Sequence, residues 1–376
     1  MPVLKPQALI DGRVAAIRKA HADAGITKAE LDISGGIDSA VMAGLLVLAL
    51  GPENVILVHS GMSTDPKQTA RAQDLANAIN CPMINIDLTN VYTQLVAMAG
   101  AAIVRSHGTQ VLDEVYARRE ADKTILGSVR STLRAPVGRM FNRMMGGGIR
   151  HGTGNECEDR FLRFYQKGGD GEVDSNPLAM LSKTEVYQLA FALGQRFDGV
   201  ALGKTLMDHD LTDDDDCAHA SRAYKATIEA TPSPDLWGEG DGHSDEAELL
   251  AMTGAPFTYG RIDPLTGSPT SYGTIERVSR FLDEYESRGM QGPLINESIL
   301  FTADRVNESD LYKAVKRSAA FAGMDYALVD KLLYAARKVE RQTRHKANPN
   351  IPTYGSREDL VDAGILTNRL EIPHGK

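Results

Sequence analysis

The stretch from Leu31 to Leu50 constrains the fold more strongly than any other part of the chain. A short apolar segment breaks into the pair Gly35-Gly36, and a long apolar run follows from Ala40. This order is typical of a strand, a tight loop and a helix. Two adjacent glycines let the backbone approach an anion without a Cβ in the way, and the first N–H groups of the helix point at the same place. We therefore expect the loop to bind phosphate groups, with an ordinary strand-to-helix turn as the alternative.

The side chains of this loop indicate which kind of phosphate it binds. Ser34 and Ser39 add hydroxyl donors, whereas the carboxylate of Asp38 would repel a bare phosphate. An acidic side chain fits such a loop when Mg2+ stands between the carboxylate and the phosphate oxygens. The spacing is neither that of the Walker loop nor that of the Gly-x-Gly-x-x-Gly dinucleotide loop. The candidate phosphate-binding residues are Ser34, Gly35, Gly36, Ile37, Asp38 and Ser39.

Strand and helix patterns alternate along the first third of the chain. The apolar run at residues 55–59 reads as a buried strand and residues 83–87 as a further strand, and helical patterns cover residues 7–25, 65–80 and 91–104. Such alternation predicts an α/β fold with a doubly wound parallel sheet. Ligands of these sheets bind at the carboxyl ends of the strands, which is where the glycine loop falls.

Composition narrows the class of protein. The 376 residues carry 41 Lys and Arg against 50 Asp and Glu, a net charge of −9, which does not favour general nucleic-acid binding. Cys81, Cys157 and Cys217 lie far apart without metal-binding spacing, which indicates a reducing compartment. Neither a signal peptide nor an apolar run long enough for a bilayer is apparent. We expect a cytoplasmic protein without a membrane partner, in two domains or in one with a large appendage.

An acidic protein that binds an anion needs local cations, and the segment between Val129 and Met145 supplies them. We expect a basic face there, on a helix interrupted near Pro136, with a solvated surface face as the alternative. The arginines concerned are Arg130, Arg134, Arg139 and Arg143.

Two further glycine-rich stretches follow. Residues 152–155 form a loop that leads into a helix with acidic residues in its first turn, where the dipole favours carboxylates in any case. Residues 167–174 form a glycine-rich turn with alternating acids. A calcium loop is the competing interpretation of this turn, but the EF-hand spacing is not met.

Taken in order and spacing, these blocks resemble the NAD synthetases of the N-type ATP pyrophosphatase superfamily, whose fold is adenine nucleotide alpha hydrolase-like. The resemblance covers about residues 7–260 and 335–354. It is carried by the loop at 34–39, by Gly152-Thr153-Gly154-Asn155 with Glu158 and Asp159, by the run from Phe164 to Pro177, and by Lys183-Thr184-Glu185-Val186. Residues 231–246 resemble the flexible loop of the family, and His345-Lys346 resembles its C-terminal tail.

The resemblance implies an ammonia-dependent enzyme that amidates deamido-NAD to NAD. ATP would activate the acid as an acyl-adenylate, with release of AMP and pyrophosphate. Family members are homodimers. The implied ATP-binding residues are Ser34 to Ser39, Thr153, Lys183 and Ser233; Asp38 and Glu158 bind Mg2+; Asp38, Glu158 and Lys183 are catalytic; and Lys167, Asp174, His345 and Lys346 bind deamido-NAD.

This sequence also departs from the family pattern, mainly on the substrate side. Thr132 stands where an arginine normally contacts the dinucleotide, and Glu156 stands where lysine is usual. Gly168 replaces a usual tyrosine, and Glu172 a usual glycine. The pattern therefore supports activation by ATP more strongly than it identifies the acid. We consider Arg130 or Arg150 as a replacement for the missing cation.

The remaining expectations concern organisation and rival functions. We divide the chain into an ATP pyrophosphatase domain at 1–260, a helical insertion at 261–335 and a returning tail at 336–376. The stretch ahead of Ser34 is too short for a glutaminase domain, so ammonia would arrive free or from a separate protein. The alternatives are the same chemistry on another carboxylate, or a nucleotide-binding module without catalysis. Sulfur transfer to tRNA is disfavoured because Cys157 has no apparent partner.

Overall fold

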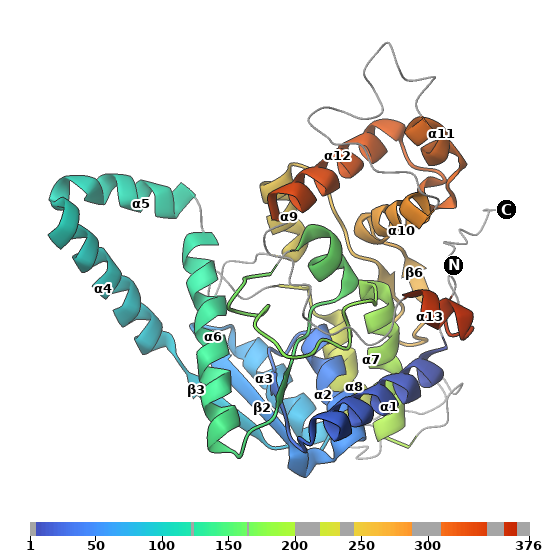
Figure 1. The fold of residues 1–376 in the computed structure, drawn as a ribbon, viewed down its shortest axis with the longest axis horizontal. Helices are drawn as coiled ribbons and strands as arrows, with labels where there is room; N and C mark the ends of the chain where they lie inside the picture. Colours follow the sequence, from blue (N-terminus) through green and yellow to red (C-terminus); the bar gives the residue numbers. More distant parts are fainter. Residues whose placement is uncertain are drawn as a thin grey trace.

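A four-stranded parallel sheet forms the base of the molecule in the computed structural model, which describes residues 5–121, 124–163, 165–199, 219–233, 244–287, 310–343 and 357–366 (Figure 1). The strand order is β3-β2-β1-β4, and every neighbouring pair is parallel. The strands are β1 (Ala29–Asp32), β2 (Val55–Gly61), β3 (Met83–Asp87) and β4 (Ile149–His151). The expected α/β class and its three apolar strands are therefore confirmed.

One face of the sheet carries the main hydrophobic core. Leu31 of β1 and Leu57 of β2 belong to it, and five helices contribute most of the other side chains. Nearly every side chain of α2 is buried, as its unbroken apolar sequence requires. The helices are α1 (Pro6–Ala24), α2 (Ile37–Leu50), α3 (Pro66–Ala78), α7 (Lys183–Phe197) and α8 (His219–Glu229).

The opposite face of the sheet is covered by α6 (Thr124–Met144) and is partly ionic. Glu30 lies beside Arg150 in the parallel register of β1 and β4, and both side chains are buried. Arg150 pairs with Glu30 and with Asp32. The prediction of a helix interrupted near Pro136 is wrong, because α6 runs through this residue. Pro136 lies on the exposed side of α6, where a carbonyl that loses its donor reaches water.

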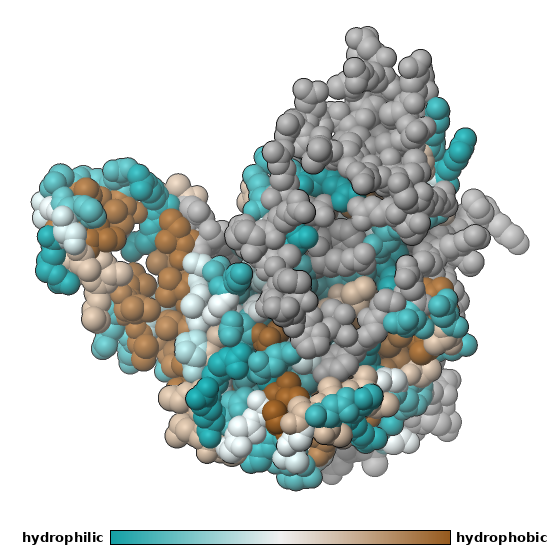
Figure 2. Space-filling view, in the orientation of Figure 1, coloured by the Kyte–Doolittle hydropathy of each residue, from teal (hydrophilic) through white to brown (hydrophobic). Residues whose placement is uncertain are grey.

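Between β3 and α6 the chain forms an arm that projects from the body (Figure 1). It consists of α4 (Thr89–His107) and α5 (Leu112–Ala121), in which none of the described residues is buried. Val91, Leu95 and Met98 lie at helical spacing on α4 and are exposed. Figure 2 shows apolar surface along the arm where α4 faces α6.

The C-terminal helices build a second hydrophobic core above the sheet. Phe281 and Leu333 belong to it, and so do Cys157 and Leu162 from the segment after β4. The helical pattern that begins at Asp310 forms two helices, separated by a 3-10 helix and a turn in which Gly323 takes a φ of 76°. The elements are α9 (Asp245–Thr253), β5 (Arg261–Ile262), β6 (Pro269–Ser271), α10 (Thr274–Ser287), α11 (Asp310–Arg317), α12 (Tyr326–Thr343) and α13 (Arg357–Asp362).

Short helical turns complete the described chain. Three are 3-10 helices, at Pro52–Asn54, Thr109–Val111 and Ala319–Phe321. The fourth, η3 (Glu156–Leu162), is a π-helix, a form that is rare and frequent at functional sites. Within the described ranges, no helix has both the length and the hydropathy needed to cross a bilayer.

Candidate active site

The loop between β1 and α2 has the conformation that its glycines predict. Gly35 takes a φ of 79°, and a Cβ at this position would overlap the backbone carbonyl of Gln68. The hydroxyl of Ser39 lies 3.1 Å from that of Ser34 and donates to the Gly36 carbonyl over 3.0 Å. Arg71 donates to the Gly35 carbonyl over 3.1 Å and so fixes the loop from α3. The result is a rigid turn at the carboxyl end of β1.

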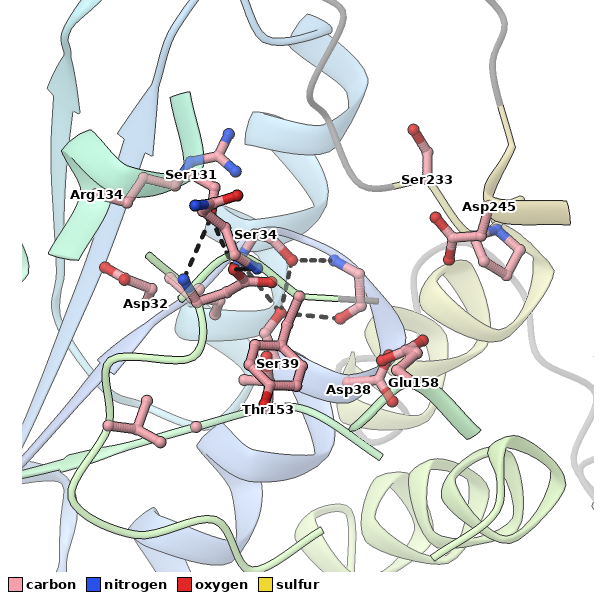
Figure 3. A pocket seen from close by; sticks show the side chains of 18 of the residues that line it. Asp32, Ser34, Asp38, Ser39, Ser131, Arg134, Thr153, Glu158, Ser233 and Asp245 are labelled. Atoms are coloured by element: carbon pink, nitrogen blue, oxygen red, sulfur yellow. Dashed lines mark hydrogen bonds between the residues drawn. The ribbon is translucent and has the colours of Figure 1, made fainter. Parts of the chain in front are cut away.

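An ammonium between two carboxylates lies directly beside the loop. Lys183 is the first residue of α7, and its Nζ donates to Asp38 Oδ2 over 2.6 Å and to Glu158 Oε1 over 2.8 Å. The ammonium also lies 4.9 Å from the ring centre of Tyr259, whose hydroxyl donates to Glu158 Oε1 over 3.3 Å. Residues from four distant segments therefore meet at one point. Figure 3 shows Asp38 and Glu158 side by side.

Asn155 links these carboxylates through its side chain. Its Nδ2 donates to Asp38 Oδ1 over 3.0 Å, while its Oδ1 accepts from the backbone N–H groups of Cys157 and Glu158 over 3.0 and 3.2 Å. The same amide thus caps η3 and orients the loop acid. Sequence reasoning used Asn155 for the resemblance but did not assign it a role.

The charge balance of the cluster is negative. Burial raises the pKa of Glu158, with Lys183 opposing and Asp38 adding to the rise. Burial likewise raises the pKa of Asp245, at the start of α9, to about 8. For Lys183, burial acts to lower the pKa, but the neighbouring Asp38 and Glu158 hold it well above its ordinary value. Lys183 therefore keeps its charge between Asp38 and Glu158, whereas a pKa of about 8 leaves Asp245 mostly protonated at neutral pH.

These groups open into a cavity of about 580 Å³ at the carboxyl edge of the sheet. Its lining includes residues of the glycine loop, the end of β2, α6 and the start of α9 (Figure 3). Of the predicted residues, the lining contains Ser34, Gly36, Ile37, Asp38, Ser39, Thr153, Glu158, Lys183 and Ser233. Most of the predicted ATP site is thus brought together in one place.

The predicted substrate-binding residues are placed differently. Lys167 is exposed and Asp174 is half exposed, and neither is part of the described cavity lining. Asp174 accepts from the Arg150 backbone N–H over 2.9 Å and pairs with Arg139 over 3.4 Å. His345 and Lys346 lie outside the described residues.

The departures from the family pattern also have structural surroundings. Thr132 is exposed on α6. Gly168 takes a φ of 83°, a backbone conformation that a tyrosine rarely adopts. Glu172 pairs with Arg139 over 3.2 Å. Glu156 is fully buried and pairs with Arg280 over 3.0 Å.

Two arginines were considered as replacements for the cation missing at position 132. Arg150 lines the cavity but is already paired with Glu30 and Asp32. Arg130 is buried, lies 5.0 Å from the ring centre of Tyr92 on α4 and is not part of the described cavity lining. Arg134, in contrast, lines the cavity, and its Nε lies 3.4 Å from the carbonyl of Ser60.

Three contributors to the site were not assigned from the sequence: Asn155, Tyr259 and Asp245. Tyr259 follows the expected flexible loop and carries no local motif, so only the folded chain reveals its contact with Glu158. Asp245 belongs to a Ser-Asp-Glu sequence that marks a helix start, and Ser244 indeed caps α9. Its burial beside a lysine 62 positions away has no local signal.

Comparisons with known proteins point to one family. The family model described as NAD synthase matches residues 9–267. An NH3-dependent NAD+ synthetase of Methanococcoides burtonii is 32% identical over 255 residues, which cover 68% of this chain and 76% of the relative. Another, of Methanosarcina acetivorans, is 31% identical over 184 residues, which cover 47% of this chain and 63% of the relative.

A solved structure extends the likeness beyond the matched domain. The structure of NMN synthetase from Francisella tularensis has a TM-score of 0.54 and 19% identity, and the similarity covers 93% of this chain and all of that one. At this identity the likeness concerns the fold alone. It includes residues after 267, where the family model ends.

Proposed function

This chain belongs to the NAD synthase family, and on that premise we propose that it uses ATP to amidate deamido-NAD with ammonia. The observation that carries the proposal is the cluster of Asp38, Lys183 and Glu158 beside the glycine loop, at the mouth of one cavity. A non-catalytic nucleotide module would need the loop but would have no use for a buried ammonium held between two acids.

The reaction proceeds in two balanced steps. An oxygen of the nicotinate carboxylate attacks the α-phosphorus of ATP, the bond to the β-phosphate oxygen breaks, and pyrophosphate leaves. Ammonia then attacks the carbonyl carbon of the acyl-adenylate, AMP leaves with the bonding electrons, and a proton is lost from nitrogen. ATP is needed because the delocalised charge of a carboxylate makes its carbon a poor electrophile.

The residues of the site match the charge that develops in the first step. The N–H groups at the start of α2, with the hydroxyls of Ser34 and Ser39, would hold the phosphates. Lys183 keeps its proton and can stabilise the departing pyrophosphate as a fixed cation. It cannot act as a base, so loss of the ammonia proton falls to another group or to water.

Asp38 and Glu158 fit a Mg2+ ion. They are hard oxygen donors at the cavity wall, and these two carboxyl groups lie on either side of the one ammonium of Lys183. Mg2+ commonly binds one or two carboxylates together with phosphate oxygens. When bound, the ion would neutralise charge on those oxygens. We assign Asp38 and Glu158 as its protein ligands.

On the substrate side we retain Lys167, Asp174, His345 and Lys346 as proposed contacts with deamido-NAD. A second candidate acid is nicotinate mononucleotide, which presents the same carboxylate without the adenylate half. The observation that favours it is Thr132, an uncharged and exposed side chain where the family pattern has an arginine for the dinucleotide. The name of the similar solved structure, NMN synthetase, makes this mononucleotide the rival to test.

We further propose a cytoplasmic homodimer that takes ammonia free or from a separate glutaminase. Support for a second copy comes from the arm, whose exposed Val91, Leu95 and Met98 form an apolar face along α4. We keep the division into residues 1–260, 261–335 and 336–376 as a working description of the chain.

The deciding assay supplies purified protein with ATP, Mg2+ and ammonia, and with either deamido-NAD or nicotinate mononucleotide. AMP, pyrophosphate and the amide should appear in equal amounts with the preferred acid. Faster turnover of the mononucleotide would select the second candidate. Absence of ATP turnover with both acids would contradict the proposed function.

A further inference from the structure

We infer that Arg280, on α10, is a positioning residue for ATP activation: it holds the turn that carries Glu158 at a fixed place relative to the first turn of α7, which carries Lys183. This inference rests on the proposed ATP site. It also gives helices α10 and α13 a role in the chemistry, although none of their described residues lines the cavity.

Arg280 joins two segments that are distant in sequence. Its Nη1 lies 3.0 Å from Glu156 Oε2, and its Nη2 lies 3.7 Å from Glu185 Oε2. Arg357 of α13 completes the group, 3.0 Å from Glu185 Oε1 and 3.9 Å from Glu156 Oε2. All four side chains are buried. Two guanidinium groups thus face two carboxylates in the interior.

The carboxylates of this group stand next to the catalytic residues. Glu156 is two residues from Glu158 on the same π-helical turn, and Glu185 is two residues from Lys183. Glu185 also closes the capping box of α7: its side chain accepts from the Ser182 N–H over 2.8 Å. Because the guanidinium contacts both segments, a change in its position alters the gap between Glu158 and Lys183, which are now 2.8 Å apart.

A second residue of α10 contacts the start of α7 independently. Glu276 accepts from the Thr184 N–H over 2.7 Å. Gly260 packs so closely here that a Cβ would overlap the side chains of Thr184 and Glu276. Arg280 and Glu276 of α10 therefore both contact the first turn of α7. These two contacts fix the position of Lys183 relative to α10.

Glu156 supplies a carboxylate that both buried arginines approach. Lysine is usual at this position in the family pattern, and a lysine here would face two arginines. The acid at 156 and the arginine at 280 therefore form a complementary pair.

The test measures metal binding as well as activity. Arg280→Met should weaken Mn2+ affinity, read by electron paramagnetic resonance with α,β-methylene ATP present, by roughly 10- to 100-fold. It should lower the adenylylation rate with little change in KM for the acid. The control is Arg196→Met on α7, the helix that carries Lys183; it removes a surface pair with Asp11 of 2.6 Å and should leave Mn2+ affinity unchanged.

Two further variants keep the test decisive if Arg280→Met does not fold. Arg280→Lys retains the charge but reaches only one carboxylate, so an intermediate loss of Mn2+ affinity is expected. Glu156→Lys should strongly weaken Mn2+ binding. In the double variant with Arg280→Glu, the Mn2+ affinity should be at least tenfold higher than in Glu156→Lys alone. Wild-type Mn2+ affinity in folded Arg280→Met or Arg280→Lys would overturn the inference.

The outcome separates this inference from the proposed function. Wild-type protein that binds Mn2+ and nucleotide but amidates neither acid would contradict the function and leave the role of Arg280 intact. If the wild-type protein amidates an acid and the Arg280 variants keep wild-type metal affinity, the proposed function is supported and the role of Arg280 is contradicted.

Discussion

Asn155 donates from Nδ2 to Asp38 Oδ1 over 3.0 Å while its carbonyl oxygen caps the turn that presents Glu158. Asn155→Asp keeps an N-cap acceptor but loses the donor and adds a charge beside Asp38. We expect a loss of stability, because the new carboxylate is buried beside Asp38 even though the cap survives. Adenylylation, followed by ATP–pyrophosphate exchange, should fall more than tenfold. Equal exchange rates in Asn155→Asp and wild type would show that the amide donor is not needed.

Lys183 provides the next test, since its ammonium is fixed between Asp38 and Glu158. Lys183→Met removes a cation aimed at developing negative charge, and the loss of one such group typically costs about 100- to 1,000-fold in kcat. Single-turnover formation of AMP is the measurement. Lys183→Arg preserves the charge with a different shape and should retain part of the rate. A Met variant as fast as the Arg variant would contradict the electrostatic role.

The glycine loop predicts a contrast between two alanine substitutions. Gly35→Ala combines a φ of 79° with overlap of the Gln68 carbonyl, so it should destabilise the protein by about 1–3 kcal/mol and abolish ATP binding. Gly12→Ala, in the middle of α1 with open space around it, should stabilise by about 0.5–1 kcal/mol. Urea unfolding and ATP titration distinguish the two, and similar behaviour of both variants would argue against a strained loop.

A buried histidine pair predicts how stability depends on pH. His21 and His151 share a contact of 3.0 Å between their Nε2 atoms, and burial lowers the pKa of His151 to about 3. In the unfolded chain the imidazole of His151 is therefore protonated below about pH 6.5, whereas in the folded protein it stays neutral down to about pH 3. This contribution to stability is complete above pH 6.5 and is lost as the pH falls, at about 1.4 kcal/mol per pH unit.

Replacing His151 tests this assignment. In His151→Gln the unfolding free energy should lose that slope between pH 4 and 6, while an amide donor toward His21 is kept. Urea unfolding at several pH values gives the slopes directly. An unchanged slope in the variant would place the acid sensitivity elsewhere.

Replacing Arg150 distinguishes a structural role of this residue from a role in binding the substrate. Because its guanidinium pairs with Glu30 and Asp32 inside the protein, Arg150→Met leaves buried acids without a partner and should cost about 3–5 kcal/mol. Adding Glu30→Gln should recover part of that loss. A variant of normal stability with a raised KM for the acid would instead make Arg150 the replacement for the missing cation.

Local sequence patterns were sufficient to predict the first three strands of the sheet and the turn after β1. The strand at Val55 begins with four apolar residues, the strands at Leu31 and Met83 are short and partly apolar, and the paired glycines between β1 and α2 favour a tight turn. The same reasoning failed at Pro136, where packing against the sheet keeps α6 intact. It failed again at Gly323, where a left-handed turn ends a helical pattern.

The contacts between the site residues could not be predicted from local sequence patterns, because these residues are far apart in the sequence. Asp38 and Lys183 are 145 positions apart, and nothing in the sequence near either residue states that they touch. Family resemblance bridged that gap. It could not do so for Glu156, because the partners of this residue come from helices outside the matched region.

The π-helical turn after Asn155 bears on how such an enzyme can change its substrate. Three successive residues face three surroundings: Glu156 the buried arginines, Cys157 the second core and Glu158 the cavity. A replacement at any one of them disturbs a different part of the protein, so this turn offers little freedom for adaptation. New acid specificity is more accessible through exposed positions on α6 and the following glycine turn, such as Thr132 and Glu172. We therefore expect relatives that use a different acid to differ at these exposed positions and to keep the ATP-binding residues.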